Sequence, residues 1–341
     1  MIDFDYEALR RLGLNNTIIS RLAGISASLP GSRLCRITEY QRDRLTLHDG
    51  AAEFSARALP RLLAGSPLCV GDWVIAESNA LNEVWISERL SPMNQLARAD
   101  APPIASNIDT ALLVMGLDGD FNLRRLERYL ALSASAEIAP LIILSKPDIS
   151  DDADEKIAAL IARIPPGTDF MKINGTDPDS VAQLNGWLGA GQTICLLGSS
   201  GAGKSTLTNA LTGALQETGG VRHGDNRGRH TTTARSMHFC PSGACIIDTP
   251  GLRSLSPDSL SSAFDDIESL ALQCQFRDCR HDGEPGCAVA GHIDPDRLRN
   301  YHKLQREVRR NQQTALDRIA ERNKWKSLMK SAAVRSRMKR G

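Results

Sequence analysis

The sequence predicts a multidomain α/β protein, and three features of its 341 residues indicate that class. Short β-branched segments run from about residue 32 to 88, apolar runs alternate with helical stretches from residue 108, and no Pro or Gly occurs between Pro295 and Gly341. A chain of this length exceeds one ordinary domain. We therefore expect a β-barrel, a helix-covered parallel sheet and a C-terminal module with a long helix.

The first expected domain is a small β-barrel. Alternating apolar and polar residues in Arg33–Ile37, Val70–Glu77 and Glu83–Ser87 are separated by Asp-Gly and Val-Gly-Asp turns, which predicts short strands. A five-stranded barrel of the OB type fits this length, and such barrels commonly bind nucleic acid on one face. Residues Ser91–Ala105 contain three prolines and are expected to form a linker.

The central part alternates strands and helices. Its expected strands are Ala111–Met115, Pro140–Leu144 and Thr193–Leu197, and its expected helices are Leu123–Ala136 and Asp151–Arg163. This order favours a mainly parallel sheet covered by helices. After Gly251 the strand pattern stops. The helical spacing that predicts a long C-terminal helix is carried by Leu298, Tyr301, Leu304 and Val308.

Composition and charge limit the class of protein. With 41% hydrophobic and 24% charged residues, the chain is typical of folded soluble proteins. No apolar run approaches ~18 residues, and Met1–Arg11 lacks the apolar core of a secretion signal, so we expect a cytoplasmic protein without a membrane partner. Residues Arg297–Gly341 carry a net charge of +12 in a chain of +1. This basic tail indicates a polyanionic partner, with a solvated helix face as the alternative.

The eight cysteines fall into two groups. In a reducing cytosol, core or metal roles are favoured over disulfides. The first group lies in apolar runs and is expected to fill the core: Cys35, Cys69, Cys195, Cys240 and Cys245. The second group belongs to the pattern Cys274-x₄-Cys279-x-His281-x₅-Cys287. Three thiolates and one imidazole satisfy tetrahedral Zn²⁺ without an open position, which predicts one structural zinc that stabilises a small domain.

A phosphate-binding loop is predicted between an apolar run and a helical segment. Residues Gly198–Ser205 match G-x-x-x-x-G-K-[ST] in this context. Backbone amides of such a loop surround phosphates, while Lys204 is expected to reach the β and γ phosphates and Ser205 to bind Mg²⁺. The predicted nucleotide-binding residues here are Gly198, Ser199, Ser200, Gly201, Ala202, Gly203, Lys204, Ser205 and Thr206.

Two later segments complete the predicted phosphate site. Asp248 ends an apolar run three residues before Gly251, so we expect Asp248 in the Mg²⁺ shell and the Gly251 amide near the γ-phosphate. The polar segment Gly228–Thr233 is a candidate switch, in which Thr232 would contribute to Mg²⁺ binding. The alternative is an exposed loop whose threonines occur by chance.

A guanine-reading motif is predicted at the end of another strand. Residues Ser145–Asp148 resemble N-K-x-D, in which Asp148 would accept hydrogen bonds from guanine N1 and N2 and the Lys146 stem would cover the base. Ser145 stands where that motif has Asn, which removes an amide that braces the pocket. Lys172–Gly175 matches the usual Ser-Ala base-contact segment poorly, so no residue is assigned there.

The order of these motifs is unusual, because the guanine motif precedes the phosphate loop, a circularly permuted arrangement. Domain termini usually lie close together, so this order can preserve the fold. Together with the segments at Gly228–Thr233 and Asp248–Gly251 and the Cys-Cys-His-Cys cluster, it closely resembles the ribosome small-subunit-dependent GTPase family, RsgA, over about residues 30 to 310. The resemblance does not cover the first 30 or the last 30 residues of the chain.

The resemblance implies a fold and a function. It implies an N-terminal extension at 1–30, an OB barrel at 31–97, a permuted GTPase domain at 98–255, a zinc domain at 256–300 and a basic tail at 301–341. It also implies binding to the small ribosomal subunit and its rRNA during late assembly, where the subunit stimulates Mg²⁺-dependent GTP hydrolysis and hydrolysis drives release. Nothing in the sequence demands more than a monomer.

The catalytic group is the least defined part of this prediction. Ras-like GTPases place a glutamine after D-x-x-G, whereas this chain has Leu252, so intrinsic hydrolysis should be slow. We hypothesise that His230 positions the attacking water once a partner orders the switch; alternatively, His230 contacts rRNA or has no role. Two other functions stay open. A zinc-dependent rRNA-binding scaffold is allowed by Ser145 and Leu252, and an ATP-using enzyme is disfavoured by Asp148.

Overall fold

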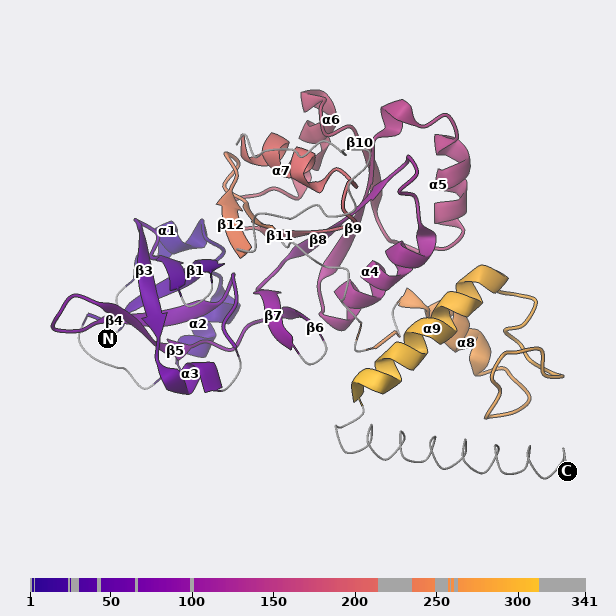
Figure 1. Cartoon of the computed structure of the whole chain (residues 1–341), viewed down its shortest axis with the longest axis horizontal. Helices are drawn as coiled ribbons and strands as arrows, with labels where there is room; N and C mark the ends of the chain where they lie inside the picture. Colours follow the sequence, from indigo (N-terminus) through magenta and orange to yellow (C-terminus); the bar gives the residue numbers. More distant parts are fainter. Residues whose placement is uncertain are drawn as a thin grey trace, which may run out of the picture.

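The computed structural model shows a β-barrel, a central sheet covered by helices, and two helices of a C-terminal module below the sheet (Figure 1). It describes residues 2, 4–23, 25, 31–41, 44–64, 67–98, 101–213, 235–248, 257, 259–260 and 263–312. Within these residues, none of the helices combines the length and the apolar character needed to cross a membrane. The predicted multidomain α/β class is confirmed.

Five strands close into the predicted OB-type barrel. They are β1 (Arg33–Gln41), β2 (Arg44–His48), β3 (Glu53–Ala58), β4 (Trp73–Ser78) and β5 (Val84–Arg89), with the short helix α3 (Pro60–Ala64) after β3. The strand order is β1-β2-β3-β5-β4, and β4 pairs back with β1. Alternate side chains point inward, as in β2, where Leu45 and Leu47 are buried. The core side chains include Cys35, Ile37, Leu45, Leu47, Val74 and Ile86.

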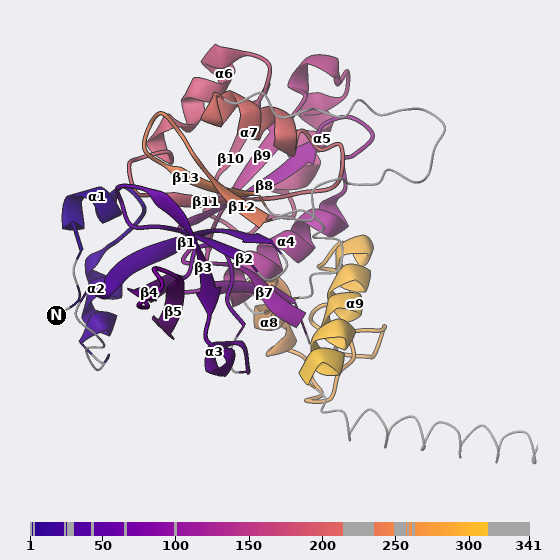
Figure 2. The same ribbon diagram turned by 60° about the vertical axis from the view of Figure 1, so that its left-hand side comes forward.

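The N-terminal residues fold onto this barrel, which the sequence did not predict. Helix α1 (Tyr6–Arg10) begins after Asp5 and helix α2 (Asn16–Leu22) after Asn15, and each of these cap side chains accepts a hydrogen bond from a backbone amide of its helix. Figure 2 shows both helices against the barrel. Their buried side chains share a hydrophobic cluster with the barrel, which contains Leu9, Leu12, Leu14, Ile18, Leu34 and Trp73.

The central sheet confirms the predicted alternation of strands and helices. Five strands are parallel in the order β10 (Phe170–Ile173), β9 (Ala139–Ser145), β8 (Thr110–Gly116), β11 (Thr193–Leu197) and β13 (Cys245–Asp248). Every residue of β8 and β11 is buried, as expected for strands covered on both faces. The helices between strands are α4 (Leu123–Ser135), α5 (Ala153–Ile161), α6 (Pro178–Ala182) and α7 (Lys204–Thr212), with 3₁₀ turns at Pro147–Ile149 and Gln183–Gly186.

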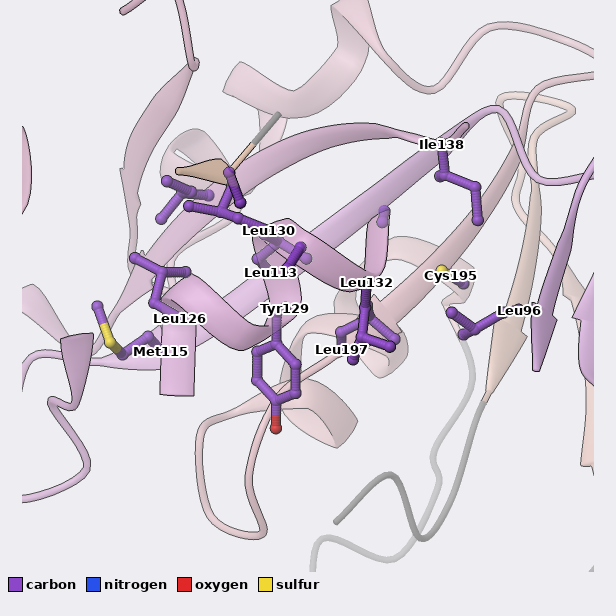
Figure 3. Close-up of a cluster of buried hydrophobic side chains, with 14 of the residues drawn as sticks. Leu96, Leu113, Met115, Leu126, Tyr129, Leu130, Leu132, Ile138, Cys195 and Leu197 are labelled. Atoms are coloured by element: carbon purple, nitrogen blue, oxygen red, sulfur yellow. The ribbon is translucent and has the colours of Figure 1, made fainter. Parts of the chain in front are cut away.

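Two hydrophobic clusters cover the two faces of the sheet. In β8, Leu113 and Met115 point toward α4, whereas Leu112 and Val114 point toward α6 and α7. Figure 3 shows the first cluster, with Leu126, Leu130 and Tyr129 of α4 against the sheet. All five cysteines that were predicted to lie in the core are buried: Cys35, Cys69, Cys195, Cys240 and Cys245.

An unpredicted edge strand joins the barrel to the central sheet. Strand β12 (Arg235–Phe239) pairs antiparallel with β13 on one side and with β1 on the other, where Glu39 faces Ser236 and Tyr40 faces Arg235. Barrel and central strands therefore form one continuous sheet. The alternation in β12 buries only Met237, so its sequence lacks the apolar run that marked the other central strands.

The predicted linker at Ser91–Ala105 is wrong, because a β-hairpin occupies most of this segment. It consists of β6 (Gln95–Arg98) and β7 (Ala101–Ser106), and it extends across position 97, where we place the first domain boundary. Prolines are tolerated in β7 because a strand at a sheet edge need not donate every amide. Leu96 and Ile104 are buried, and a bridge between Val70 and Ala105 fixes the hairpin to the barrel.

In the described part of the C-terminal module there are two helices, α8 (Asp265–Ala271) and α9 (Pro295–Gln312). The long helix predicted beyond Pro295 is confirmed as far as Gln312. Its apolar stripe is buried against the cluster that α4 covers, through Tyr301, Leu304 and Val308. Residues 313–341 of the basic tail lie outside the described part of the chain.

Candidate nucleotide-binding site and metal centre

The predicted phosphate loop connects β11 to α7 at the carboxyl edge of the parallel strands. Gly201 and Gly203 have φ angles of +85° and +94°, which glycine adopts at little cost. Gly198 allows a close approach, because a Cβ there would lie 2.5 Å from the carbonyl oxygen of Val114. Helix α7 begins at Lys204, so the loop amides lie at a helix N-terminus, where anions are favoured.

The loop holds its lysine inward. The Lys204 Nζ donates to the carbonyl oxygens of Gly198 at 2.9 Å and Ser199 at 2.6 Å. This places the ammonium beside the loop backbone, where Coulomb attraction favours a phosphate. Of the other predicted loop residues, Ala202 is buried, Thr206 is half-buried, and Ser200 and Ser205 are exposed.

The predicted guanine motif meets this loop directly. Strand β9 ends at Ser145, whose hydroxyl donates to the carbonyl oxygen of Ala202 at 2.6 Å. The serine therefore braces the phosphate loop without the amide that Asn would have supplied. Lys146 follows with a φ of +58°, and Asp148 is exposed in the 3₁₀ turn Pro147–Ile149.

Two acidic residues at this site were not found from the sequence. Asp118 and Asp120 lie between β8 and α4, and β8 is the direct neighbour of both β9 and β11. Asp118 pairs with Lys146, and Asp120 accepts from the hydroxyl of Ser199. Their position after a buried strand of a parallel sheet could have indicated that they lie at this site, since the ends of neighbouring strands meet at one edge.

The predicted magnesium residues are only partly described. Asp248 ends β13, which runs parallel to β11 with Ile247 opposite Cys195, so Asp248 lies at the same sheet edge as the phosphate loop. Its side chain is half-buried. Gly251, Thr232 and the candidate catalytic His230 lie outside the described residues.

The predicted metal ligands come together in the C-terminal module. One donor atom from each of Cys274, Cys279, His281 and Cys287 lies within 4.8 Å of all the others. The Nδ1 of His281 is 3.6 Å from the Cys274 sulfur and 3.5 Å from the Cys287 sulfur. Tetrahedral Zn²⁺ with bonds of about 2.3 Å to sulfur needs donors roughly 3.5 to 4 Å apart, so this donor set fits a closed metal site.

Backbone amides donate to two of the sulfurs of the cluster. The amide of Ala288 donates to the Cys274 sulfur at 3.4 Å and that of Ala290 to the Cys287 sulfur at 3.3 Å. Burial opposes ionisation of Cys287, but the Ala290 amide and His281 outweigh it and lower the pKa of this thiol to about 6. Cys279 is shifted the other way: the His281 amide favours its thiolate, but burial and hydrogen bonds with the Cys287 and Cys274 sulfurs outweigh it and raise the pKa of that thiol to about 11.

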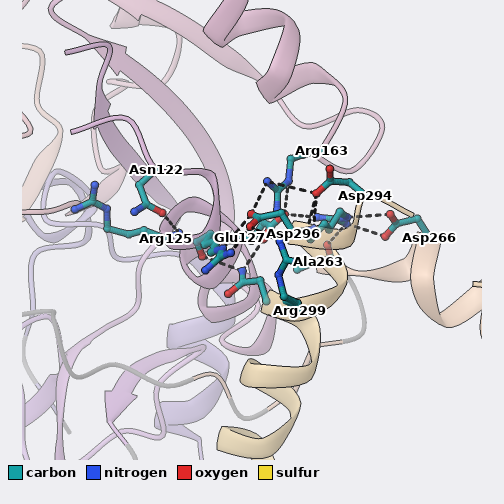
Figure 4. A network of polar contacts seen from close by, with 12 residues as sticks. Asn122, Arg125, Glu127, Arg163, Ala263, Asp266, Asp294, Asp296 and Arg299 are labelled. Atoms are coloured by element: carbon teal, nitrogen blue, oxygen red, sulfur yellow. Dashed lines mark hydrogen bonds and ion pairs between the residues drawn. The ribbon is translucent and has the colours of Figure 1, made fainter. Parts of the chain in front are cut away.

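A polar network centred on the buried Glu127 and Arg297, which we call the α4–α9 clamp, holds this module against the central domain (Figure 4). Glu127 of α4 is 2% exposed and accepts from Arg297 at 2.8 Å and Arg163 at 3.0 Å. Arg297 also pairs with Asp266 of α8 at 2.8 Å. The clamp consists of Glu127, Arg163, Asp266, Asp296, Arg297 and Asn300.

Comparison with known proteins agrees with this architecture. Residues 86–257 match the sequence profile described as RsgA GTPase. The chain is 40% identical to a protein of Xanthomonas axonopodis pv. citri (strain 306) over 96% of both chains. It is 42% identical to one of Xanthomonas euvesicatoria pv. vesicatoria (strain 85-10), over 87% of this chain and 80% of that one. Both are named "Small ribosomal subunit biogenesis GTPase RsgA".

Two solved structures share the fold. YloQ, described as a circularly permuted GTPase, has 25% identity and a TM-score of 0.57, over 85% of this chain and 99% of its own. YjeQ from Thermotoga maritima has 23% identity and a TM-score of 0.62, over 81% of this chain and 98% of its own. With the predicted guanine motif at the end of β9 ahead of the phosphate loop after β11, this chain is a GTP hydrolase with the circularly permuted order and belongs to the RsgA GTPase family.

Proposed function

We propose that this protein acts in the cytoplasm in late assembly of the small ribosomal subunit, where it binds the subunit as a monomer and hydrolyses GTP. The subunit stimulates hydrolysis, and hydrolysis drives release. The relatives' names support the small ribosomal subunit as the partner, because the sequence similarity to them extends over nearly the whole chain. The observation that carries the proposal is the hydrogen bond between Ser145 and Ala202, because it joins the base-reading motif to the phosphate loop.

Each predicted residue has a role in this proposal. Asp148 reads guanine, the Lys146 stem covers the base, and Ser145 braces the pocket. The Gly251 amide contacts the γ-phosphate and His230 positions water. The loop residues that bind the phosphates are Gly198, Ser199, Ser200, Gly201, Ala202, Gly203, Lys204, Ser205 and Thr206. Ser205, Thr232 and Asp248 hold Mg²⁺, and Cys274, Cys279, His281 and Cys287 hold one structural Zn²⁺.

The barrel surface supports the proposed contact with rRNA. The Arg33 guanidinium lies 4.5 Å from the centre of the Phe54 ring, and that of Arg57 lies 5.9 Å from the Trp85 ring. Arginines over aromatic rings on an OB barrel suit stacking on bases and attraction to phosphates. With the basic C-terminal residues, this predicts affinity for the subunit that falls steeply with salt.

Co-sedimentation with purified small subunits tests the proposal. We expect the protein to pellet with subunits when it carries a non-hydrolysable GTP analogue and to pellet less with GDP. Lys204→Ala should abolish this difference between nucleotides, because the variant loses the phosphate contact. The matched control is Lys172→Ala, at an exposed lysine of β10, which should behave as the unmodified chain does. Equal pelleting in both nucleotide states, or none in either, contradicts the proposal.

A further inference from the structure

The loop Gly116–Asp120 is fixed firmly beside both nucleotide motifs. The Leu117 amide donates to the Ser145 carbonyl at 2.9 Å. In the other direction, the Leu117 carbonyl accepts from the Ser150 hydroxyl at 2.7 Å and from the Lys156 Nζ at 2.6 Å. The loop is therefore positioned by β9, by Ser150 and by Lys156 of α5.

The first acidic residue of this loop holds the lysine of the guanine motif. Oδ2 of Asp118 lies 2.7 Å from Nζ of Lys146, and its Oδ1 accepts from the Asp120 amide at 3.1 Å. Partial burial opposes ionisation of Asp118, but these hydrogen bonds outweigh it and hold the pKa of the carboxyl below its usual value. Lys146 has its side chain fixed at the far end while its backbone adopts a positive φ. Its carbon stem is thus held in one direction.

The second acidic residue holds the phosphate loop. Oδ1 of Asp120 accepts from the Ser199 hydroxyl at 2.5 Å and pairs with Arg125 at 2.8 Å. Its other oxygen accepts from the Gly116 amide at 3.3 Å. Asp120 therefore connects the start of α4 to the phosphate loop at Ser199, whereas Ser145 contacts the loop at Ala202.

We propose that Asp118 and Asp120 are positioning residues of the GTPase site, Asp118 fixing Lys146 over the base and Asp120 fixing the phosphate loop at Ser199. The inference rests on the proposed role of Lys146 at the base. It assigns the two carboxylates to different halves of the nucleotide. A surface ion pair with no such role would contribute little to binding.

The two halves are separated by measuring affinity for GDP and for inorganic tripolyphosphate, which has no base. Asp118→Ala should weaken GDP binding about fivefold and leave tripolyphosphate binding unchanged, because the charge-assisted hydrogen bond that holds Lys146 is lost. Asp118→Glu should recover part of the loss. Asp120→Ala should weaken both ligands by the same factor. The matched control is Asp154→Ala, an exposed carboxylate of α5, which should change neither.

Thermal unfolding of each variant shows whether it remains folded. Asp118→Asn and Asp120→Asn, which keep the side-chain shape, each replace the alanine variant at the same position if that variant does not. The inference is overturned if Asp118→Ala changes both ligands equally or neither, or if Asp120→Ala affects GDP alone. Asp148→Ala distinguishes this failure from that of the proposed function. If Asp148→Ala weakens GDP binding while Asp118→Ala does not, only the positioning role fails; if neither does, the guanine assignment fails.

Discussion

At the scale of single residues, Ser145 shows how the predicted guanine motif contacts the phosphate loop. Ser145 is 7% exposed, and its hydroxyl donates to the Ala202 carbonyl, so a buried acceptor of the phosphate loop is satisfied. A shorter side chain thus reaches the phosphate loop where the usual motif has Asn. The brace depends on one hydrogen bond.

Removing that hydroxyl should weaken both the fold and the site. We expect Ser145→Ala to lower the free energy of unfolding by about 1 to 2 kcal/mol, because the Ala202 carbonyl loses its partner in a buried place. GDP affinity should fall as well. Urea unfolding and a GDP titration measure the two effects.

The matched control for this substitution is Ser133→Ala in α4. The Ser133 hydroxyl is also buried and also donates to a backbone carbonyl, that of Tyr129 at 3.0 Å, but it lies away from the nucleotide motifs. It should leave GDP affinity unchanged. An unchanged GDP affinity in Ser145→Ala would show that the brace has no part in binding.

At the scale of elements, helix α4 connects the nucleotide site to the C-terminal module. It begins directly after Asp118 and Asp120, and its Glu127 is the centre of the α4–α9 clamp. Two arginines share this carboxylate in a nearly water-free place, which is stable only while all partners are present.

Breaking the clamp should therefore destabilise the protein strongly. Glu127→Ala leaves the Arg297 and Arg163 guanidiniums without their buried carboxylate, and we expect a loss of about 3 to 5 kcal/mol in unfolding free energy. Urea unfolding measures the loss, and limited proteolysis should show faster cleavage in α9. Glu155→Ala, at an exposed glutamate of α5, is the control. A loss below about 1 kcal/mol would mean that the clamp does not hold the module.

The elements also show which parts of the structure a sequence reveals. Strands β8, β9 and β11 were predictable because burial on both faces requires continuous apolar runs. The metal ligands were predictable because their spacing is local. Strand β12 and the β6–β7 hairpin were not, since β12 buries one side chain and its pairing with β1 joins residues about 200 positions apart. Asp118 and Asp120 belong to no sequence motif, and their place at the nucleotide site follows only from the strands that lie beside β8.

At the scale of the whole molecule, the permuted order determines what the nucleotide site is connected to. Strand β13 ends at Asp248, and the chain then continues to the C-terminal module, which the clamp fixes to α4. On the other side, β12 joins the central sheet to the barrel. The barrel and the C-terminal module therefore both contact the GTPase domain through defined pairings.

The central claim is a GTP-selective turnover that the small ribosomal subunit stimulates. The most direct measurement is hydrolysis of GTP and of ATP by the full chain, each with and without purified small subunits, with Lys204→Ala as the inactive reference. The account predicts slow GTP hydrolysis by the chain alone, a rise of at least about tenfold with subunits, and no such rise with ATP. GTP turnover that subunits leave unchanged, or equal stimulation with ATP, would contradict it.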